Sequence, residues 1–365
     1  MAPKVRPGIM EIAPYVGGEA SIPGISRPAK LSSNENPLGP SPKAMAAFHE
    51  AAVELHRYPD GGAEKLRDGI ARRFGLEKEL IVCGNGSDEL IALLTRAYAG
   101  LGDEVLFSRH GFLMYRLSAL AVGATPRAAP EKNLATDMEA LLAMVTPATR
   151  IVFLGNPNNP TGSYLTAKEL RELRRRLPGD VLLAIDAAYA EYVEAEDYDA
   201  GEDLVRAGDN TVMLRTFSKI FGLAGLRLGW AYCPPGVADV LNRVRGPFNT
   251  SAPAQAAALA ALEDREHERR SREHNKTWRD WLSAVLAKQG YRVHPSVGNF
   301  LLIEFADADA ADRFLKSRGL ILRKMGPYGL ERCLRLTIGT EAEVRALAAA
   351  LADFAGAGAV AAERP

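Results

Sequence analysis

The chain has 365 residues, of which 25% are charged and 47% hydrophobic, and its 45 lysines and arginines balance 45 aspartates and glutamates. This length suffices for about two domains with proper cores, at roughly 150 residues per domain. A formal net charge of zero excludes a global field that would attract nucleic acid or an anionic membrane, so local residues must hold any bound anion.

Residues 1–40 are rich in proline and glycine and carry no apolar core of a secretion signal. They predict an ordered arm laid across a surface, with a flexible leader as the alternative. No apolar stretch of the chain is long enough to span a bilayer. The cysteines, Cys83, Cys233 and Cys333, are isolated and odd in number, and the histidines show no metal-ligand spacing. We therefore expect a cytoplasmic protein without a metal site.

Amphipathic helices are predicted over residues 41–55 and 63–74, followed by a short strand at 80–83. The loop 84–89 then leads directly into an apolar helix at 90–99. A strand, a glycine turn and a helix amino terminus can hold a phosphate on backbone N–H groups. The loop is neither a Walker P-loop nor a Rossmann fingerprint, and an ordinary helix cap is the commoner explanation for such a turn.

Apolar strands then alternate with helical segments, which predicts an α/β fold with a mostly parallel central sheet and helices on both of its faces. The helical segments lie near residues 136–145 and 166–177. The strands are predicted at residues 104–107, 150–154, 181–185, 211–214 and 228–232.

The last third of the chain predicts a smaller α+β domain. A long helical stretch leads from Ser251 toward Leu286, and its charge run at 263–273 predicts a solvated helix face. Two strands, at 299–305 and 333–338, flank a predicted helix at 308–317. We expect the chain to divide into an amino-terminal arm that joins the small domain, a large domain, a connecting helix and the small domain, at 1–40, 41–250, 251–285 and 286–365.

Polar residues follow three of the predicted parallel strands. Asn159 lies in the loop 155–162, Asp186 and Tyr189 follow the next strand, and Lys219 ends the polar turn after the strand 211–214. The carboxyl ends of such strands bind ligands, so we expect these groups to converge at one edge of the sheet. Pyridoxal phosphate (PLP) requires such a set: a lysine amine, an acid for the pyridinium nitrogen, hydrogen-bond donors to the ring oxygen, and a phosphate cradle.

Lys219 is reactive only when its amine is deprotonated, whereas a free lysine has a pKa of ~10.4. Burial and nearby cations lower such a pKa, and Arg215 and Arg227 are close in sequence. A Schiff base with a carbonyl compound is the typical use of such an amine, and a solvated loop lysine is the alternative. The glycines that follow are expected to let the backbone pass close to a bulky group. They are Gly222, Gly225 and Gly229.

Four motifs in this order carry a family resemblance: Asn-Pro-Asn-Asn-Pro-Thr-Gly, Asp-x-x-Tyr, Ser-Lys, and an arginine eight residues after the lysine. The chain resembles the PLP-dependent aminotransferases of fold type I, and most closely the histidinol-phosphate aminotransferases. The resemblance extends from Ile12-Ala-Pro-Tyr15 to Arg335-Leu-Thr-Ile-Gly339. The combination of all four motifs is highly specific.

The resemblance implies a role for each strand-end residue. Lys219 would form the internal aldimine and then move the proton between the substrate Cα and the cofactor. Asp186 would pair with the pyridinium nitrogen, while Asn159 and Tyr189 would bond the ring oxygen. The phosphate would be held by Ser87, Asp88, Thr216, Ser218 and Arg227.

Two aromatic residues complete the implied cofactor site. Phe112 stands where the family stacks a ring on the cofactor; most relatives have tyrosine there, so a hydroxyl contact is absent here. Tyr58 matches the tyrosine that reaches the cofactor phosphate of the neighbouring subunit. The resemblance therefore implies a homodimer with shared active sites.

The implied reaction is transamination between L-histidinol phosphate and 2-oxoglutarate, giving imidazole-acetol phosphate and L-glutamate by a ping-pong mechanism in histidine biosynthesis. Arg335 would hold the substrate carboxylate or phosphate ester, because its guanidinium suits planar anions. Arg323, Tyr15 and Asn159 are further candidates for substrate contact. For Arg323 and Tyr15, an exposed arginine and a packing tyrosine are the alternatives.

Other functions remain open at this point. An aromatic or dual-specificity aminotransferase would share the pocket, and a threonine-phosphate decarboxylase would share the fold. A NAD-dependent dehydrogenase would need the missing Gly-x-Gly-x-x-Gly. A PLP-sensing transcription regulator would need a DNA-binding domain, for which the arm is too short and too rich in proline.

Overall fold

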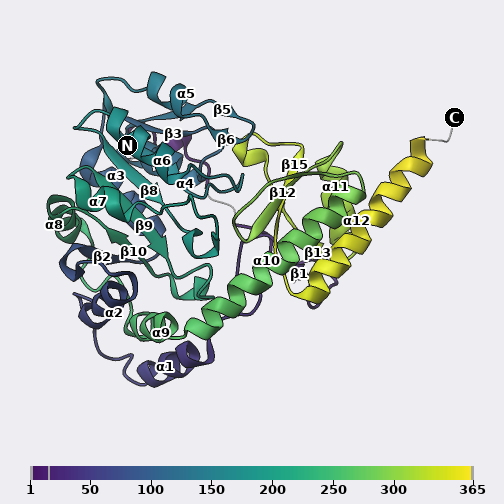
Figure 1. The fold of residues 1–365 in the computed structure, drawn as a ribbon, viewed down its shortest axis with the longest axis horizontal. Helices are drawn as coiled ribbons and strands as arrows, with labels where there is room; N and C mark the ends of the chain where they lie inside the picture. The colour runs from purple at the N-terminus through teal and green to yellow at the C-terminus, as the bar shows by residue number, and fades with distance from the viewer. Residues whose placement is uncertain (1–2, 15–16, 363–365) are drawn as a thin grey trace.

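The computed structural model describes residues 3–14 and 17–362, and two larger sheets organise it (Figure 1). In the first of these sheets, β10 runs antiparallel to both of its neighbours, while the other strands all point the same way. The mostly parallel sheet is thereby confirmed; β4 was not predicted. In spatial order its strands are β2 (Ile81–Gly84), β10 (Gly229–Tyr232), β9 (Thr211–Thr216), β8 (Leu182–Asp186), β7 (Thr149–Gly155), β3 (Glu104–Ser108) and β4 (Thr125–Ala129).

Helices cover both faces of this sheet, as predicted. Val212 and Leu214 pack on one face with residues of three helices, whereas Met213 between them packs on the other, because successive strand residues point to opposite faces. The first face carries α3 (Ser87–Tyr98), α4 (Leu113–Val122) and α8 (Pro235–Val244). The second face carries α2 (Glu64–Phe74), α5 (Met138–Ala143), α6 (Ala167–Arg176), α7 (Glu202–Ala207) and α9 (Ala252–Glu263), with α1 (Pro42–Ala52) packed on α9.

The second sheet is antiparallel and lies in the last third of the chain. One of its faces forms a separate apolar core with three helices, and α10 runs from beside α9 to this sheet (Figure 1). Its strands are β11 (Arg292–His294), β12 (Phe300–Glu304), β15 (Cys333–Thr337) and β14 (Arg323–Lys324). The helices are α10 (Arg265–Lys288), α11 (Ala308–Ser317) and α12 (Glu341–Ala362).

The amino-terminal arm is attached to this second part of the molecule. Strand β1 (Ala29–Lys30) pairs in parallel with β13 (Leu320–Ile321), and Leu31 is buried in the same apolar core. A further small hairpin pairs β5 (Glu131–Lys132) with β6 (Ala135–Thr136). These contacts suit the expected arm and small domain, although the domain boundaries stay a prediction.

The helical stretch predicted from Ser251 toward Leu286 is present, but it is divided into α9 and α10. The division lies at Asp264, which leaves the helical conformation and whose side chain caps α10 by accepting a bond from the His267 N–H at 3.3 Å. Most of the charge run is exposed, as predicted, with one exception. Glu268 is buried and pairs with Arg73 at 3.0 Å and Arg272 at 2.5 Å.

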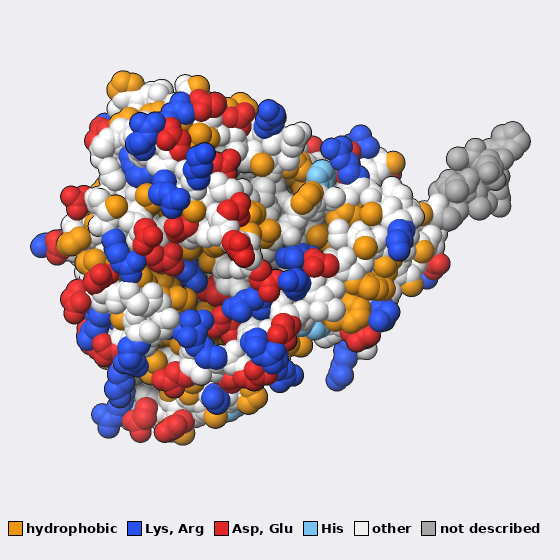
Figure 2. All heavy atoms as spheres, in the orientation of Figure 1, with side chains coloured by type: hydrophobic (Ala, Val, Ile, Leu, Met, Phe, Trp, Pro, Cys, Tyr) orange, Lys and Arg blue, Asp and Glu red, His pale blue; other side chains and the backbone are white. Residues whose placement is uncertain are grey.

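The surface agrees with a formal net charge of zero. Figure 2 shows lysine and arginine side chains interspersed with aspartate and glutamate over the visible face. Within residues 3–14 and 17–362, no helix combines the length and the apolar character needed to cross a membrane.

Candidate active site

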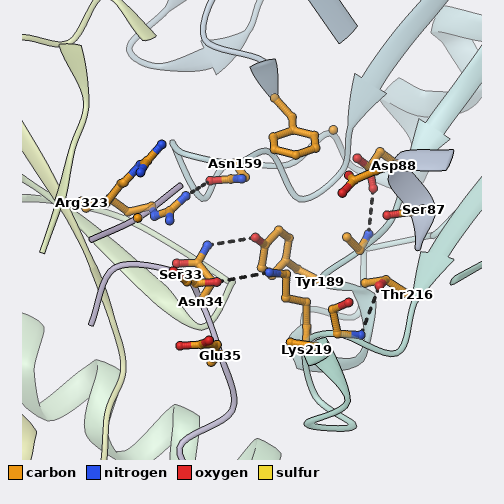
Figure 3. Close-up of a pocket in the computed structure, with 18 of the residues that line it drawn as sticks. Ser33, Asn34, Glu35, Ser87, Asp88, Asn159, Tyr189, Thr216, Lys219 and Arg323 are labelled. Atoms are coloured by element: carbon orange, nitrogen blue, oxygen red, sulfur yellow. Dashed lines mark hydrogen bonds between the residues drawn. The ribbon is translucent and has the colours of Figure 1, made fainter. Parts of the chain in front are cut away.

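A pocket of about 290 Å³ lies where the carboxyl ends of β7, β8 and β9 meet the arm and the second sheet (Figure 3). The predicted convergence of strand-end residues is therefore present. Residues 32–35 of the arm also line the pocket, which the sequence did not indicate. The predicted residues in its lining are Ser87, Asp88, Phe112, Asn159, Asp186, Tyr189, Thr216, Ser218, Lys219, Arg227, Arg323 and Arg335.

One predicted residue within the described part of the chain, Tyr58, is not brought into this pocket. It is 83% exposed and stacks on Phe248, with ring centroids 4.7 Å apart. Tyr15 lies outside the described residues.

Lys219 follows β9 and reaches into the pocket, where its Nζ donates to the Ser33 carbonyl at 3.4 Å (Figure 3). Burial lowers the pKa of this amine to about 8, and the positive charges of Arg335 and Arg227 add to the lowering. Its Nζ also lies 5.6 Å from the ring centroid of Tyr189. A much larger share of this amine is therefore neutral near pH 7 than of a free lysine.

The expected contribution of Arg215 to this lowered pKa was wrong. Although only three residues separate it from Lys219, its guanidinium is buried elsewhere and pairs with Glu191 at 2.9 Å and Glu202 at 3.1 Å. Arg335, from β15, takes the place that the sequence suggested for Arg215.

Asp186 ends β8 and is buried at the floor of the pocket. Its Oδ2 accepts a bond from the Tyr115 hydroxyl at 2.8 Å, and its Oδ1 accepts one from the Ala188 N–H at 3.3 Å. Burial nevertheless raises the pKa of this carboxyl to about 6. Tyr115 was not predicted, because a tyrosine on the apolar face of α4 is indistinguishable in sequence from an ordinary core residue.

Tyr189 and Arg335 are both held by the arm. The Tyr189 hydroxyl accepts a bond from Asn34 Nδ2 at 2.9 Å, and burial raises the pKa of this phenol to about 12. Arg335 donates to the Ser32 carbonyl at 2.8 Å and to Asn159 Oδ1. Asn34 and Ser32 were also missed, since nothing local in that turn-rich segment indicates partners on β15 or after β8.

The opposite end of the pocket is formed by the start of α3 and the turn after β9. Gly86 precedes α3 with φ 84°, and no side chain caps the first N–H groups of the helix. Arg227 donates to Asp88 Oδ2 at 3.1 Å and to Ser218 Oγ at 3.4 Å. Helix amino termini with an adjacent arginine and hydroxyls suit an anion.

The glycines after Lys219 meet the prediction only in part. A Cβ on Gly222 would lie 2.3 Å from the Gly39 carbonyl oxygen, and one on Gly229 would lie 2.4 Å from the Ser87 nitrogen. Both positions therefore require glycine for close backbone approach. Gly225 faces open space, so the prediction for it was wrong.

The fold and the pocket define a site of the enzyme type, in which a half-buried lysine amine and a buried carboxyl line one pocket at the carboxyl edge of an α/β sheet. Comparison with known proteins gives the family. The profile of the family described as "Aminotransferase class I and II" matches residues 27–351. The chain belongs to this family.

Close relatives match nearly the whole chain. It is 59% identical over 361 residues to the histidinol-phosphate aminotransferase of Paramagnetospirillum magneticum, covering 98% of this chain and 99% of the relative. It is 58% identical over 356 residues to that of Rhodospirillum centenum, covering 96% and 98%. Among solved structures, the histidinol-phosphate aminotransferase of Sinorhizobium meliloti in complex with pyridoxal-5′-phosphate has a TM-score of 0.88 at 30% identity, covering 96% of this chain and 97% of that one.

Proposed function

We propose that this protein transfers the amino group of L-histidinol phosphate to 2-oxoglutarate, giving imidazole-acetol phosphate and L-glutamate, with pyridoxal phosphate as cofactor. The near full-length similarity to histidinol-phosphate aminotransferases supports this reaction. The observation that carries it is the convergence of Lys219, Asp186, Tyr189 and Asn159 in one pocket.

The residues of the pocket fit the cofactor at both of its ends. At the phosphate end, Gly86 and Gly229 have no side chains that would fill the space beside the start of α3. A Cβ on Gly86 would lie 2.6 Å from Arg227 Nη2. The uncapped N–H groups of Ser87 and Asp88 and the Arg227 guanidinium would hold the phosphate. At the other end, the buried Asp186 carboxyl bonds to the Tyr115 hydroxyl and the Ala188 N–H and forms no salt bridge with the described residues, and a protonated ring nitrogen would supply one.

When bound, pyridoxal phosphate supplies an electron-withdrawing ring that stabilises negative charge at the substrate Cα. Lys219, whose pKa of about 8 leaves part of the amine neutral near pH 7, would take the proton from the substrate Cα and deliver it to C4′ of the cofactor. Asn159 and Tyr189 would hydrogen-bond the ring oxygen. Phe112, at the amino terminus of α4, would cover the ring face.

Arg335 anchors the anionic group of both substrates. It is buried, and its bonds to the Ser32 carbonyl and Asn159 Oδ1 fix the plane of its guanidinium. A planar fork in a fixed plane binds a carboxylate or a phosphate ester through paired hydrogen bonds. Arg323 lines the same end of the pocket and supplies a second positive charge (Figure 3).

The active assembly is a homodimer in this proposal. Tyr58 and Phe248 form an exposed aromatic stack, and Val53 and Leu55, shortly before Tyr58 in sequence, are 74% and 69% exposed. An adjoining groove of about 630 Å³ between α1, α2 and α9 is lined largely by alanine and leucine. Apolar area of this kind favours association, and a second copy would bring Tyr58 to the phosphate end of the neighbouring pocket.

A cytoplasmic location completes the proposal. Cys83, Cys233 and Cys333 are all free and buried, which suits a reducing compartment.

The test is a half-reaction with single amino donors. Purified protein loaded with pyridoxal phosphate is mixed with histidinol phosphate, phenylalanine, tyrosine or threonine phosphate, and the loss of the visible cofactor band is followed. Much faster conversion by histidinol phosphate supports the proposal. Equal rates with phenylalanine and tyrosine would make the enzyme an aromatic or dual-specificity aminotransferase.

A further inference from the structure

Three side chains from distant parts of the sequence form a buried hydrogen-bond chain at the edge of the pocket. The hydroxyl of Thr337, on β15, bonds to Asn34 of the arm, and Asn34 bonds to the phenol of Tyr189 after β8. All three residues are buried. The chain thus joins both sheets through a single arm residue.

The direction of each bond follows from the donors that are fixed. The Thr337 hydroxyl accepts from the Asn34 backbone N–H at 2.8 Å, so its own proton is directed to the Asn34 side chain at 3.3 Å. The atom that receives it must be the amide oxygen, Oδ1. The amide nitrogen, Nδ2, then faces Tyr189 at 2.9 Å and can only donate to it.

Because the Tyr189 oxygen accepts from Asn34, its own O–H proton must go to another acceptor. The phenol lines the pocket, and Figure 3 shows its oxygen between Asn34 and the open space below Asn159. The backbone of Asn34 is fixed by a hydrogen bond, because Asn299 Nδ2 donates to its carbonyl at 3.0 Å. Its φ is 55°, a conformation that asparagine tolerates better than most residues.

We propose that Asn34 and Thr337 are positioning residues that orient the Tyr189 proton toward the ring oxygen of the cofactor. This inference rests on the cofactor assignment in the proposed function. A hydroxyl that donates to this oxygen withdraws negative charge from it. The Lys219 nitrogen beside the oxygen then loses its proton at a lower pH.

The main test replaces Asn34 by aspartate, which can only accept. In Asn34→Asp the Tyr189 proton turns to the new carboxylate and the ring oxygen loses its donor. We expect the pH midpoint of the visible absorbance change of the bound cofactor to rise by about one unit or more, without any turnover being measured. The matched control is Asn36→Asp in the same arm, because Asn36 is also buried but bonds to the Ile220 carbonyl and Ser271 instead. Its midpoint should rise less than that of Asn34→Asp, because this variant adds a charge near Lys219 but leaves the Tyr189 hydroxyl as it is.

A double-mutant cycle separates the hydroxyl from the new charge. If Asn34 acts through Tyr189, the midpoint of Tyr189→Phe is raised and Asn34→Asp adds nothing to it. Additive shifts would show a direct charge effect and would overturn the inference. Thr337→Val, which keeps the side-chain shape and removes only the hydroxyl, should raise the midpoint in the same direction, and Thr337→Ser should restore it.

The two hypotheses fail in different ways. Without a visible band in the wild-type protein plus pyridoxal phosphate, the proposed function is wrong. With a normal wild-type band but unshifted midpoints in Asn34→Asp and Thr337→Val, only the positioning role is wrong. If Asn34→Asp does not fold, the Thr337 pair decides the question.

Discussion

Replacing Asp186 by asparagine should stabilise the apoprotein while it disables the enzyme. Burial raises the pKa of this carboxyl from 3.8 to about 6. The folded chain therefore holds the proton more tightly than the unfolded chain, and ionising the group costs stability as the pH rises from 3.8 to about 6. Above that pH the cost is constant at about 3 kcal/mol, from a difference of about two pKa units.

Asparagine removes this cost because it is neutral at every pH. Its amide oxygen can keep the bond from the Ala188 N–H, and its Nδ2 can donate to the Tyr115 oxygen in place of the bond that the carboxylate accepts. For a chain of this length, about 3 kcal/mol corresponds to a rise of about 4 °C in the thermal midpoint. We expect this rise for the Asp186→Asn apoprotein at pH 8, about half of it at pH 5, and little of it at pH 4.

The assay is thermal unfolding of the apoproteins at these three pH values. Asp180→Asn is the control, because the Asp180 side chain is 75% exposed and its replacement should change the midpoint little. Turnover of the cofactor-loaded Asp186→Asn protein should fall about 10²- to 10⁴-fold, since a buried cation loses its partner. An equal gain in midpoint at pH 8 and pH 4, or no gain at pH 8, would refute the raised pKa as the cause.

Three further substitutions test the other roles. Lys219→Ala should abolish both the visible cofactor band and turnover, and normal activity would remove the cofactor assignment. Arg335→Ala should raise the KM for glutamate and for histidinol phosphate together, because both anions share one guanidinium; steady-state kinetics that show neither effect would place the substrates elsewhere. Tyr58→Ala should be weakly active alone, yet mixing it with inactive Lys219→Ala should restore activity, since half of the random hybrid dimers' sites are then intact. No recovery on mixing would mean that Tyr58 does not act across subunits.

Local sequence predicted the parts of the site that lie directly after strands. Asn159, Asp186 and Lys219 follow runs of apolar residues whose β character is clear from composition alone, and parallel strands carry their carboxyl ends to one edge. Once the sheet is predicted, the location of these three residues at its carboxyl edge follows without further information.

The residues that were missed reach the pocket in ways that local sequence does not show. Tyr115 lies within the helix α4, and only the tertiary packing brings its hydroxyl to Asp186. Asn34 bonds to groups that are 155 and 303 residues away. Arg215 is the opposite case: it is close to Lys219 in sequence, but its side chain points away from the pocket and pairs with Glu191. Closeness in sequence does not show to which face of the sheet a side chain on β9 points.

Burial lowers the pKa of Lys219 and raises the pKa of Asp186, because it disfavours the charged form of each side chain. The neutral amine is the reactive form that the proposed function requires, so burial assists Lys219 directly. The carboxyl must be ionised, so burial opposes Asp186 until a cation lies beside it. A protonated cofactor ring removes that cost on binding, which adds to its affinity. Burial of the site thus favours the same cofactor at both residues, and the arm segment 32–35, which forms one wall of the pocket, helps to maintain it.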